Sequence, residues 1–230
     1  MNITEFRLKI YMLKSVNIKG MLEQISKIVD CCLINEGMRQ VHEDTYHKLY
    51  TFNGFYPVEP SGVYEEGQIY SVTIRTLDKE IKEAFKRGLA VQCTSVIKAL
   101  TTEHRDVNQK YVEKIFSITP VILKFDQEGY WREHHSVSEF ERRIKVGLVK
   151  KYNMIYDTKL DEDFDWVLGV KFDNHKPIAS DYKNIQLLGD KVTIHIADNE
   201  IAQKLAWIAV GSGIGEMCAR GYGFVNFRYL

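Results

Sequence analysis

Apolar and polar residues follow two different periods in the first part of the chain. Residues 3–13 mix β-branched and aromatic residues with polar ones at alternate positions, which predicts a strand. The next apolar residues, over 21–32, recur at helical spacing, and Gly37 is suited to ending a helix. Residues 47–56 and 67–77 are rich in aromatic and β-branched residues and flank a turn-rich segment, so they predict a hairpin with a long loop.

A second helix and a further strand complete this half of the chain. Asp78 is suited to capping a short helix with one apolar face, and Gly88 is suited to ending it. A β-rich stretch at 111–125 follows, and its middle, near residue 118, is the expected domain boundary. The order strand, helix, strand, strand, helix, strand is that of the ferredoxin-like unit, a four-stranded antiparallel sheet with two helices on one face.

The second half has the same predicted order of elements. In chain order, the pattern predicts a strand at 119–131, a helix at 138–152, strands at 164–174 and 183–197, a helix from near Asp198 and a strand at 222–229. Ser136 and Glu139 have the spacing of a capping box, which supports the start of the first of these helices. The sequence therefore predicts an α+β protein with two tandem ferredoxin-like domains, at 1–118 and 119–230.

The end of the chain is rich in glycine, since five of the fifteen glycines lie between positions 211 and 223. Glycine tolerates positive φ and lets the backbone approach another molecule closely, so such a loop is suited to cradling phosphate or sugar. A tight connection between a helix and a strand would also use glycines. The dinucleotide-binding fingerprint is excluded because Glu216 interrupts its spacing and the loop follows a helix. A phosphate-binding P-loop is excluded because its Gly-Lys-Ser/Thr sequence is absent.

Residues 220–227 also match the octapeptide of the RNA recognition motif, which would make Tyr222 and Phe224 surfaces for base stacking. That octapeptide belongs on the third strand of its module, and only three residues follow Phe227 here. A standard module of this kind is therefore not expected. A general single-strand RNA-binding module that stacks bases on Tyr222 and Phe224 stays open as an alternative.

Residues 213–224 resemble the GxGxxxxxG[FY]G signature found near the C-terminus of the repeat-associated RNA-processing superfamily. In particular they are similar to the CRISPR repeat endoribonucleases, the family of CRISPR-associated protein six. In that family the loop joins the last helix and the last strand of a second ferredoxin-like domain, as it is predicted to do here. The resemblance implies that the loop binds RNA, with the candidates Gly211, Gly213, Gly215, Arg220, Gly221 and Gly223.

A histidine segment ahead of an aromatic strand extends the resemblance. Residues 41–53 are similar to the family's pattern of a histidine, a short spacer, a lysine or proline and an aromatic strand. Cleaving RNA without metal requires the neighbouring 2′-OH to attack phosphorus, and a histidine with a pKa of about 6.5 can act as general acid or base. We expect His42 in that role and Lys48 as the cation that stabilises charge on the phosphate. Tyr46 and His47 are candidates to assist.

The chain departs from the family in its first predicted helix. Many members carry a tyrosine there as a second catalytic group, whereas residues 14–41 contain no tyrosine. Lys27 and Ser26 are candidates to replace it. The alternative is a site that depends on His42 and Lys48 alone.

Basic residues in the second half are further candidates for RNA contacts. The segment 136–151 is rich in lysine and arginine, and both a solvated helix face and an RNA-binding surface fit that pattern. Two lysines flank a predicted hairpin, while the acidic stretch 157–165 is expected to face away from RNA. The candidates are Arg142, Arg143, Lys145, Lys183 and Lys191.

No metal or other cofactor is expected. His134 and His135 are adjacent and cannot easily share one ion, and the chain has no histidine, cysteine or carboxylate set with ligand spacing. The four cysteines lack a CxxC pair and are expected to be reduced. No run approaches the ~18 apolar residues that span a bilayer, and the N-terminus does not resemble a signal peptide, so we expect a cytoplasmic protein without a membrane partner.

Charge sharpens the expected mode of RNA binding. The chain has 31 basic and 31 acidic residues, which excludes a protein that binds polyanions through a strongly basic surface. Recognition should depend on a local groove and base contacts.

The expected function is an endoribonuclease that cuts precursor CRISPR transcripts once per repeat, leaving 2′,3′-cyclic phosphate and 5′-OH ends, and whose product guides an interference complex. The rival is a non-catalytic subunit that holds guide RNA in an effector complex; a homodimer is left open.

Overall fold

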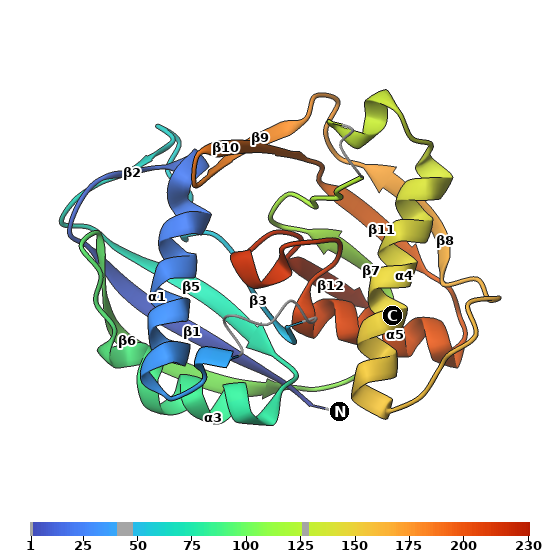
Figure 1. Ribbon diagram of the computed structural model, residues 1–230, viewed down its shortest axis with the longest axis horizontal. Helices are drawn as coiled ribbons and strands as arrows, with labels where there is room; N and C mark the ends of the chain where they lie inside the picture. The colour runs from blue at the N-terminus through green and yellow to red at the C-terminus, as the bar shows by residue number, and fades with distance from the viewer. Residues whose placement is uncertain (1, 41–47, 126–128) are drawn as a thin grey trace.

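The computed structural model of the protein describes residues 2–40, 48–125 and 129–230. The first sheet is antiparallel, with the strand order β3-β5-β1-β6, and is packed against two helices (Figure 1). Its strands are β1 (Ile3–Met12), β3 (Tyr50–Phe52), β5 (Ile69–Thr76) and β6 (Ile97–Val107), and its helices are α1 (Met21–Asn35) and α3 (Lys79–Gly88).

The second sheet has the order β12-β7-β11-β8 and is also antiparallel. Its strands are β7 (Val112–Ser117), β8 (Val167–Phe172), β11 (Val192–Ile196) and β12 (Val225–Tyr229), and its helices are α4 (Val137–Tyr156) and α5 (Glu200–Ser212). In chain order each sheet and its helices read strand, helix, strand, strand, helix, strand. The predicted α+β fold of two tandem ferredoxin-like units is therefore confirmed.

Shorter elements connect these two units. A hairpin of β9 (Ile178–Tyr182) and β10 (Ile185–Gly189) reaches from the second unit across to the N-terminal end of α1 (Figure 1). The strands β2 (Val16–Asn17) and β4 (Val63–Tyr64) form a small pair. The 3₁₀ helices are η1 (Ile18–Gly20), η2 (Leu89–Val91), η3 (Trp131–Glu133) and η4 (Cys218–Arg220), the last of which lies within the glycine loop.

The helix caps follow directly from the sequence. Asp78 caps α3 by accepting hydrogen bonds from the N–H groups of Glu80 at 2.8 Å and Ile81 at 2.9 Å, as predicted. Ser136 and Glu139 form the predicted capping box at the start of α4. These local bonds satisfy N–H groups that a helix end leaves without partners.

The strand β6 was not predicted, and the stretch 111–125 was assigned to the wrong sheet. Of the residues in β6, only Ile97 and Ala99 are buried, so its pattern reads as polar. It nevertheless pairs with β1 along its whole length and is the fourth strand of the first sheet. β7 is the first strand of the second sheet, so the chain leaves the first sheet between β6 and β7, ahead of the boundary expected at residue 118.

Two further strand predictions were inaccurate. The predicted strand at 119–131 is wrong: Val121 and Ile122 make only isolated bridges, to Asp190 and Glu216, and η3 follows. Pro120 has no N–H to donate to a sheet, which favours such an irregular segment. The predicted strand at 183–197 is divided into β10 and β11, because β10 pairs with β9 in the hairpin whereas β11 pairs with β7 and β8 in the second sheet.

The two units share buried contacts. Arg75 of β5 is 4% exposed and reaches the second sheet, where its guanidinium donates to the Val225 carbonyl at 2.7 Å and to Asn226 Oδ1 at 2.9 Å. Glu5 balances its charge at 2.8 Å. Tyr222, from the glycine loop, is buried in the core of the first unit. The glycine loop is therefore part of the junction between the units.

In the described part of the chain, no helix is long and apolar enough to cross a membrane. Within the same residues, no group of three or more histidine, cysteine, aspartate or glutamate side chains is arranged to hold a metal ion.

Candidate RNA interface and active site

The glycine loop joins α5 to β12, and four of its glycines adopt positive φ. These are Gly213 at 77°, Gly215 at 74°, Gly221 at 86° and Gly223 at 64°. Gly211 differs from them because it lies inside α5, where an added Cβ would approach the Leu77 side chain to 2.5 Å. The sequence placed all five in one loop, but Gly211 permits close packing of a helix, whereas the other four permit the path of the loop.

Many N–H groups of the loop already bind carbonyl or hydroxyl oxygens of the protein. Ile214 N–H donates to the Gly223 carbonyl at 2.9 Å, and Gly223 N–H donates to the Pro120 carbonyl at 2.8 Å. Glu216 N–H donates to the Ile122 carbonyl at 2.9 Å, and Phe224 N–H donates to Thr119 Oγ1 at 2.9 Å. These donors hold the loop on the segment that precedes α4, so they are not available to a phosphate.

The other side of the loop packs on β3 of the first unit. A Cβ added to Gly221 would approach the ring of Phe52 to 2.4 Å, and one added to Gly213 would approach Thr51 Oγ1 to 3.0 Å. The glycines therefore allow β3 and the loop to lie in close contact. Tyr222 and Phe224 are 0% and 1% exposed, so the alternative in which these two rings stack RNA bases is wrong.

Replacing Gly221 by alanine should destabilise the protein. A residue other than glycine held at positive φ costs about 1–3 kcal/mol, and the new Cβ would also press on Phe52. Gly147 is the matched control, because it lies within α4 with no atom within 4 Å of an added Cβ. Gly147→Ala should raise stability by about 0.5–1 kcal/mol. Denaturant unfolding of both variants checks this, and equal effects would contradict the assignment.

Arg220, the cation of the loop, is turned toward α1. Its Nη1 donates to Ser26 Oγ at 2.7 Å and pairs with the Asp30 carboxylate, and its side chain is 17% exposed. Burial alone would lower the pKa of Arg220, but the Asp30 carboxylate outweighs burial and raises it. Tyr50 of β3 is close to this pair, and burial, with a smaller contribution from Asp30, raises the pKa of its hydroxyl.

Of the catalytic candidates, His42, Tyr46 and His47 lie outside the described residues. Lys48 is half-buried and lies two residues before Tyr50, the first residue of β3. Lys27 is exposed on α1 and pairs with Glu23 at 2.9 Å. The structure thus places the two described candidates on α1 and just before β3, and the glycine loop touches both elements.

The hairpin turn of β9 and β10 meets the same helix. Lys183 lies in that turn at a positive φ of 53°, and its N–H donates to the Glu23 carboxylate at 3.0 Å. Hydrogen bonding from Lys27 is the largest cause of the lowered pKa of Glu23, and the Lys183 N–H adds to it. Lys191 is more distant in the chain and half-buried; its N–H donates to Asn174 Oδ1 at 2.7 Å.

The basic residues of α4 differ in their partners and in their exposure to solvent. Arg143 donates to the Lys124 carbonyl at 3.0 Å and to the Glu216 carboxylate at 3.1 Å, which ties α4 to the glycine loop. Lys145 donates to the backbone carbonyls of Glu162 and Phe164. Arg142 is exposed to solvent. Only part of this run is therefore free to present charge to RNA.

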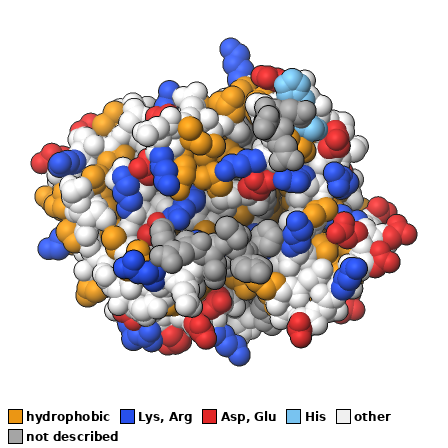
Figure 2. All heavy atoms as spheres, viewed as in Figure 1, with side chains coloured by type: hydrophobic (Ala, Val, Ile, Leu, Met, Phe, Trp, Pro, Cys, Tyr) orange, Lys and Arg blue, Asp and Glu red, His pale blue; other side chains and the backbone are white. Residues whose placement is uncertain are grey.

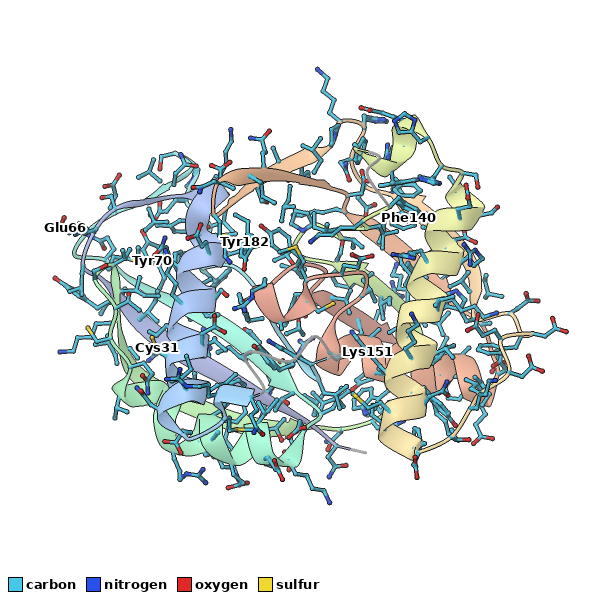
Figure 3. All side chains as sticks on the ribbon, viewed as in Figure 1. Cys31, Glu66, Tyr70, Phe140, Lys151 and Tyr182 are labelled. Carbon is cyan, nitrogen blue, oxygen red and sulfur yellow. The ribbon has the colours of Figure 1, made fainter. Side chains whose placement is uncertain are left out.

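Lys151 is a residue that the sequence reasoning treated as one more surface charge. It is 3% exposed, and its Nζ donates to the carbonyls of Ser212 at 3.0 Å and Gly213 at 2.9 Å. Figure 3 shows it on the side of α4 that faces α5. Helical spacing from Ile144 and Leu148 could have revealed its buried position. Its ammonium binds the last carbonyls of α5, where a cation is favoured.

Asp190 is a second residue that the sequence reasoning missed. Its carboxylate is fully buried and accepts hydrogen bonds, each of 2.7 Å, from Tyr130, Trp131, Arg132 and Asn174. Its backbone also exchanges two hydrogen bonds with Val121. Because Pro120 and Ile122 accept from the glycine loop, Asp190 anchors the segment on which the loop rests.

Several basic side chains lie on the face of the molecule that Figure 2 shows. Figure 2 shows lysine and arginine side chains around α1, the glycine loop and α4, with acidic side chains concentrated at the edge beyond α4. This arrangement provides local positive charge within a chain that has none overall. It is the kind of surface on which a nucleic acid can be oriented without strong non-specific binding.

Comparisons with known proteins were made for both sequence and fold. A curated protein that matches the sequence was not found. Among solved structures, the fold is similar to that of an RAMP protein that binds different RNA substrates, with a TM-score of 0.70 and 16% identity over 98% of this chain and 99% of that chain. A Cas6-related protein of Pyrococcus furiosus gives 0.68 and 17%, over 98% of each chain. A Thermus thermophilus Cas6 gives 0.61 and 14%, over 99% and 98%.

At these identities the solved structures show a common fold. The sequence itself is matched by the family model for the C-terminal part of the CRISPR associated protein Cas6, over residues 82–227. That match covers more than half of the chain, including α4, α5 and the glycine loop. We conclude that this protein belongs to the Cas6 family of CRISPR-associated proteins.

Proposed function

We propose that this protein is an endoribonuclease that binds CRISPR repeat RNA and cuts the precursor transcript once within each repeat. The observation that carries the proposal is the position of the family's glycine loop. It rests on β3 and α1, and the candidate catalytic segment with His42 lies between these two elements in the chain. Family membership and a Cas6 solved as a product complex, with a TM-score of 0.63, support the same reading.

In the proposed reaction the RNA supplies its own nucleophile. The 2′-OH beside the scissile phosphate attacks phosphorus in line, the 5′-oxygen of the next nucleotide leaves, and a 2′,3′-cyclic phosphate remains. His42 transfers a proton as general acid or base. Lys48 stabilises the charge that develops on the phosphate oxygens. No metal-bound water is needed, because the attacking oxygen belongs to the substrate.

A second proton-transferring group would complete the site. Tyr46, His47 and Lys27 are the candidates. Between the two positions of α1, Lys27 is better suited than Ser26, because Lys27 is exposed whereas the Ser26 hydroxyl is buried and accepts from Arg220. The Lys27 side chain is 52% exposed.

RNA is proposed to lie across this basic face. Arg142 and Lys183 are exposed there, and Arg143, Lys145 and Lys191 lie nearby with part of their hydrogen-bonding capacity already in use. The carbonyls and remaining N–H groups of the loop from Gly213 to Gly223 would contact the sugar and phosphate groups. The cut product is proposed to stay bound and to pass to an interference complex, with the protein as a monomer or a homodimer.

The chemistry of the product ends tests this proposal. The purified protein is incubated in EDTA with an RNA that carries its own repeat, and the fragments are separated on a gel. We expect one cut per repeat, a 5′-OH on the downstream fragment, and an upstream fragment whose 3′-end resists ligation until its cyclic phosphate is opened. Loss of cutting in EDTA, or a 3′-OH product, would contradict the mechanism. Binding without any cutting would favour a non-catalytic guide-RNA subunit.

A further inference from the structure

A partly buried ion pair joins the glycine loop to α1. Arg220 in η4 pairs with Asp30 and donates to Ser26, two residues of α1 that are one helical turn apart. The side chains of Arg220 and Asp30 are only 17% and 16% exposed. Such a pair favours one geometry, because breaking it would leave a partly buried charge without its partner.

The same pair is in contact with the start of the first sheet. Gly221, the next residue after Arg220, lies against the ring of Phe52 in β3 and the side chain of Leu22 in α1. Tyr50, in the same strand, is fully buried beside the charges of Asp30 and Arg220. Three elements, α1, β3 and η4, therefore meet at the Arg220–Asp30 pair.

We propose that Arg220 and Asp30 are positioning residues for RNA cleavage, whose ion pair fixes α1 and β3 against the glycine loop. This rests on the proposed function, since α1 and β3 carry or adjoin the candidates Lys27 and Lys48. A small displacement of α1 relative to β3 would move these groups apart. Catalytic groups act only when neighbouring contacts hold them close to the productive geometry.

The sequence alone suggests a different role for Arg220, which is direct contact with an RNA phosphate. The two roles make opposite predictions for Asp30→Asn. If Asp30 withholds Arg220 from RNA, its neutralisation frees a cation, tightens RNA binding and steepens the dependence of binding on salt. If the pair positions α1 and β3, neutralisation slows cleavage of bound RNA and leaves the salt dependence unchanged.

The experiment uses the full chain and three variants of the pair: Arg220→Met, Asp30→Asn and the double exchange of Arg220→Asp with Asp30→Arg. For each we measure the cleavage rate at saturating repeat RNA and the binding constant at several salt concentrations. Both single variants should cut at least about tenfold more slowly, and the double exchange should recover part of the loss. A tighter complex with Asp30→Asn, cut at the normal rate, would overturn the proposal.

Two further variants distinguish a specific role of the pair from a general loss of stability. Ser26→Ala removes one acceptor without leaving a charge and should slow cleavage in the same direction, by less. Arg87→Met is the matched control, because Arg87 pairs with Glu36 at 2.7 Å, at the far end of α1 and away from the glycine loop. It should cut at the wild-type rate. A loss of rate with Arg87→Met as large as that with Arg220→Met would overturn the specific role of the pair.

A measurement without RNA separates this proposal from the proposed function. Amide hydrogen exchange of Tyr50–Phe52 and of α1 is followed in the free protein. Exchange should become faster in Arg220→Met and Asp30→Asn and slower again in the double exchange. If the wild-type protein fails to cut RNA while exchange behaves in this way, the proposed function is wrong, but the role of the Arg220–Asp30 pair in fixing α1 and β3 is supported. If exchange is unchanged in both single variants, the Arg220–Asp30 pair does not fix α1 and β3, and the proposal is refuted.

Discussion

Replacing His42 by alanine is expected to reduce cleavage of repeat RNA by about 10²–10⁴-fold, the contribution that a positioned general acid or base typically makes. Binding of the uncut RNA should change little, because the imidazole is proposed to act on a proton rather than to hold the RNA. Single-turnover cleavage and a filter-binding titration of the same preparation measure the two effects separately.

His134 provides the matched control for this prediction. His134 lies at the C-terminal end of η3, outside the proposed site, and its side chain is 50% exposed. His134→Ala should cut at the wild-type rate, which would show that a general loss of imidazole is not responsible. A His42→Ala variant that cuts at the wild-type rate would remove His42 from the mechanism. The function would then depend on Lys48 and the candidates Tyr46, His47 and Lys27.

Replacing Asp190 by alanine is expected to lower the free energy of unfolding by about 3–5 kcal/mol. The change leaves the Arg132 guanidinium, whose side chain is 27% exposed, without the fully buried carboxylate at 2.7 Å, and it removes the acceptor of Tyr130, Trp131 and Asn174. Breaking a buried pair by removing one member has a cost of this size. Urea unfolding followed by tryptophan fluorescence measures it directly, since Trp131 donates to Asp190.

Asp163→Ala is the control for the Asp190 variant, because Asp163 is an exposed aspartate of the acidic stretch 157–165. Its effect should stay within about 0.5 kcal/mol. Equal and small effects of the two changes would show that the buried network contributes little. Asp190→Asn retains the shape of the side chain and one acceptor oxygen, so it should fall between the wild-type protein and Asp190→Ala.

The sequence predicted those elements whose information is local. The caps of α3 and α4 were identified because a polar side chain three residues from its partner N–H is visible in the sequence. β6 was not, because seven of its eleven side chains are polar and its place at the sheet edge depends on pairing with β1. β7 was assigned to the wrong sheet for the same reason, since pairing partners are not written in a strand's own residues.

At the candidate site, too, the sequence predicted local features but not the contacts between distant residues. The positions of the glycines in the loop were read correctly, but their role in close packing depends on Phe52 and Ile214, which are distant in the sequence. Arg220 and Arg143 were candidates for RNA contacts, and Lys151 was one charge of the basic run 136–151. In the structure they bind Asp30, Glu216 and the end of α5. A cation's partner is set by the tertiary structure, so composition alone overstates how much charge faces RNA.

The zero net charge of the chain can be related to the partners of its basic residues. Several arginines and lysines are used to join elements of the protein, as Arg75 joins the two sheets. Other lysine and arginine side chains lie on the face with α1 and α4 (Figure 2). Specific contacts should therefore contribute more to recognition than bulk attraction, and RNA binding should fall less steeply with salt than for a strongly basic protein.

The most direct measurement of the central claim uses a repeat RNA in which the single nucleotide on the 5′ side of the cut lacks its 2′-OH. The all-ribose RNA and the substituted RNA are bound to the purified protein at saturation, and cleavage is followed over one turnover. If the RNA supplies its own nucleophile, the substituted RNA should bind with nearly the same affinity and remain uncut. Cleavage of the substituted RNA at the same bond would contradict the account, because the attacking oxygen would then come from elsewhere.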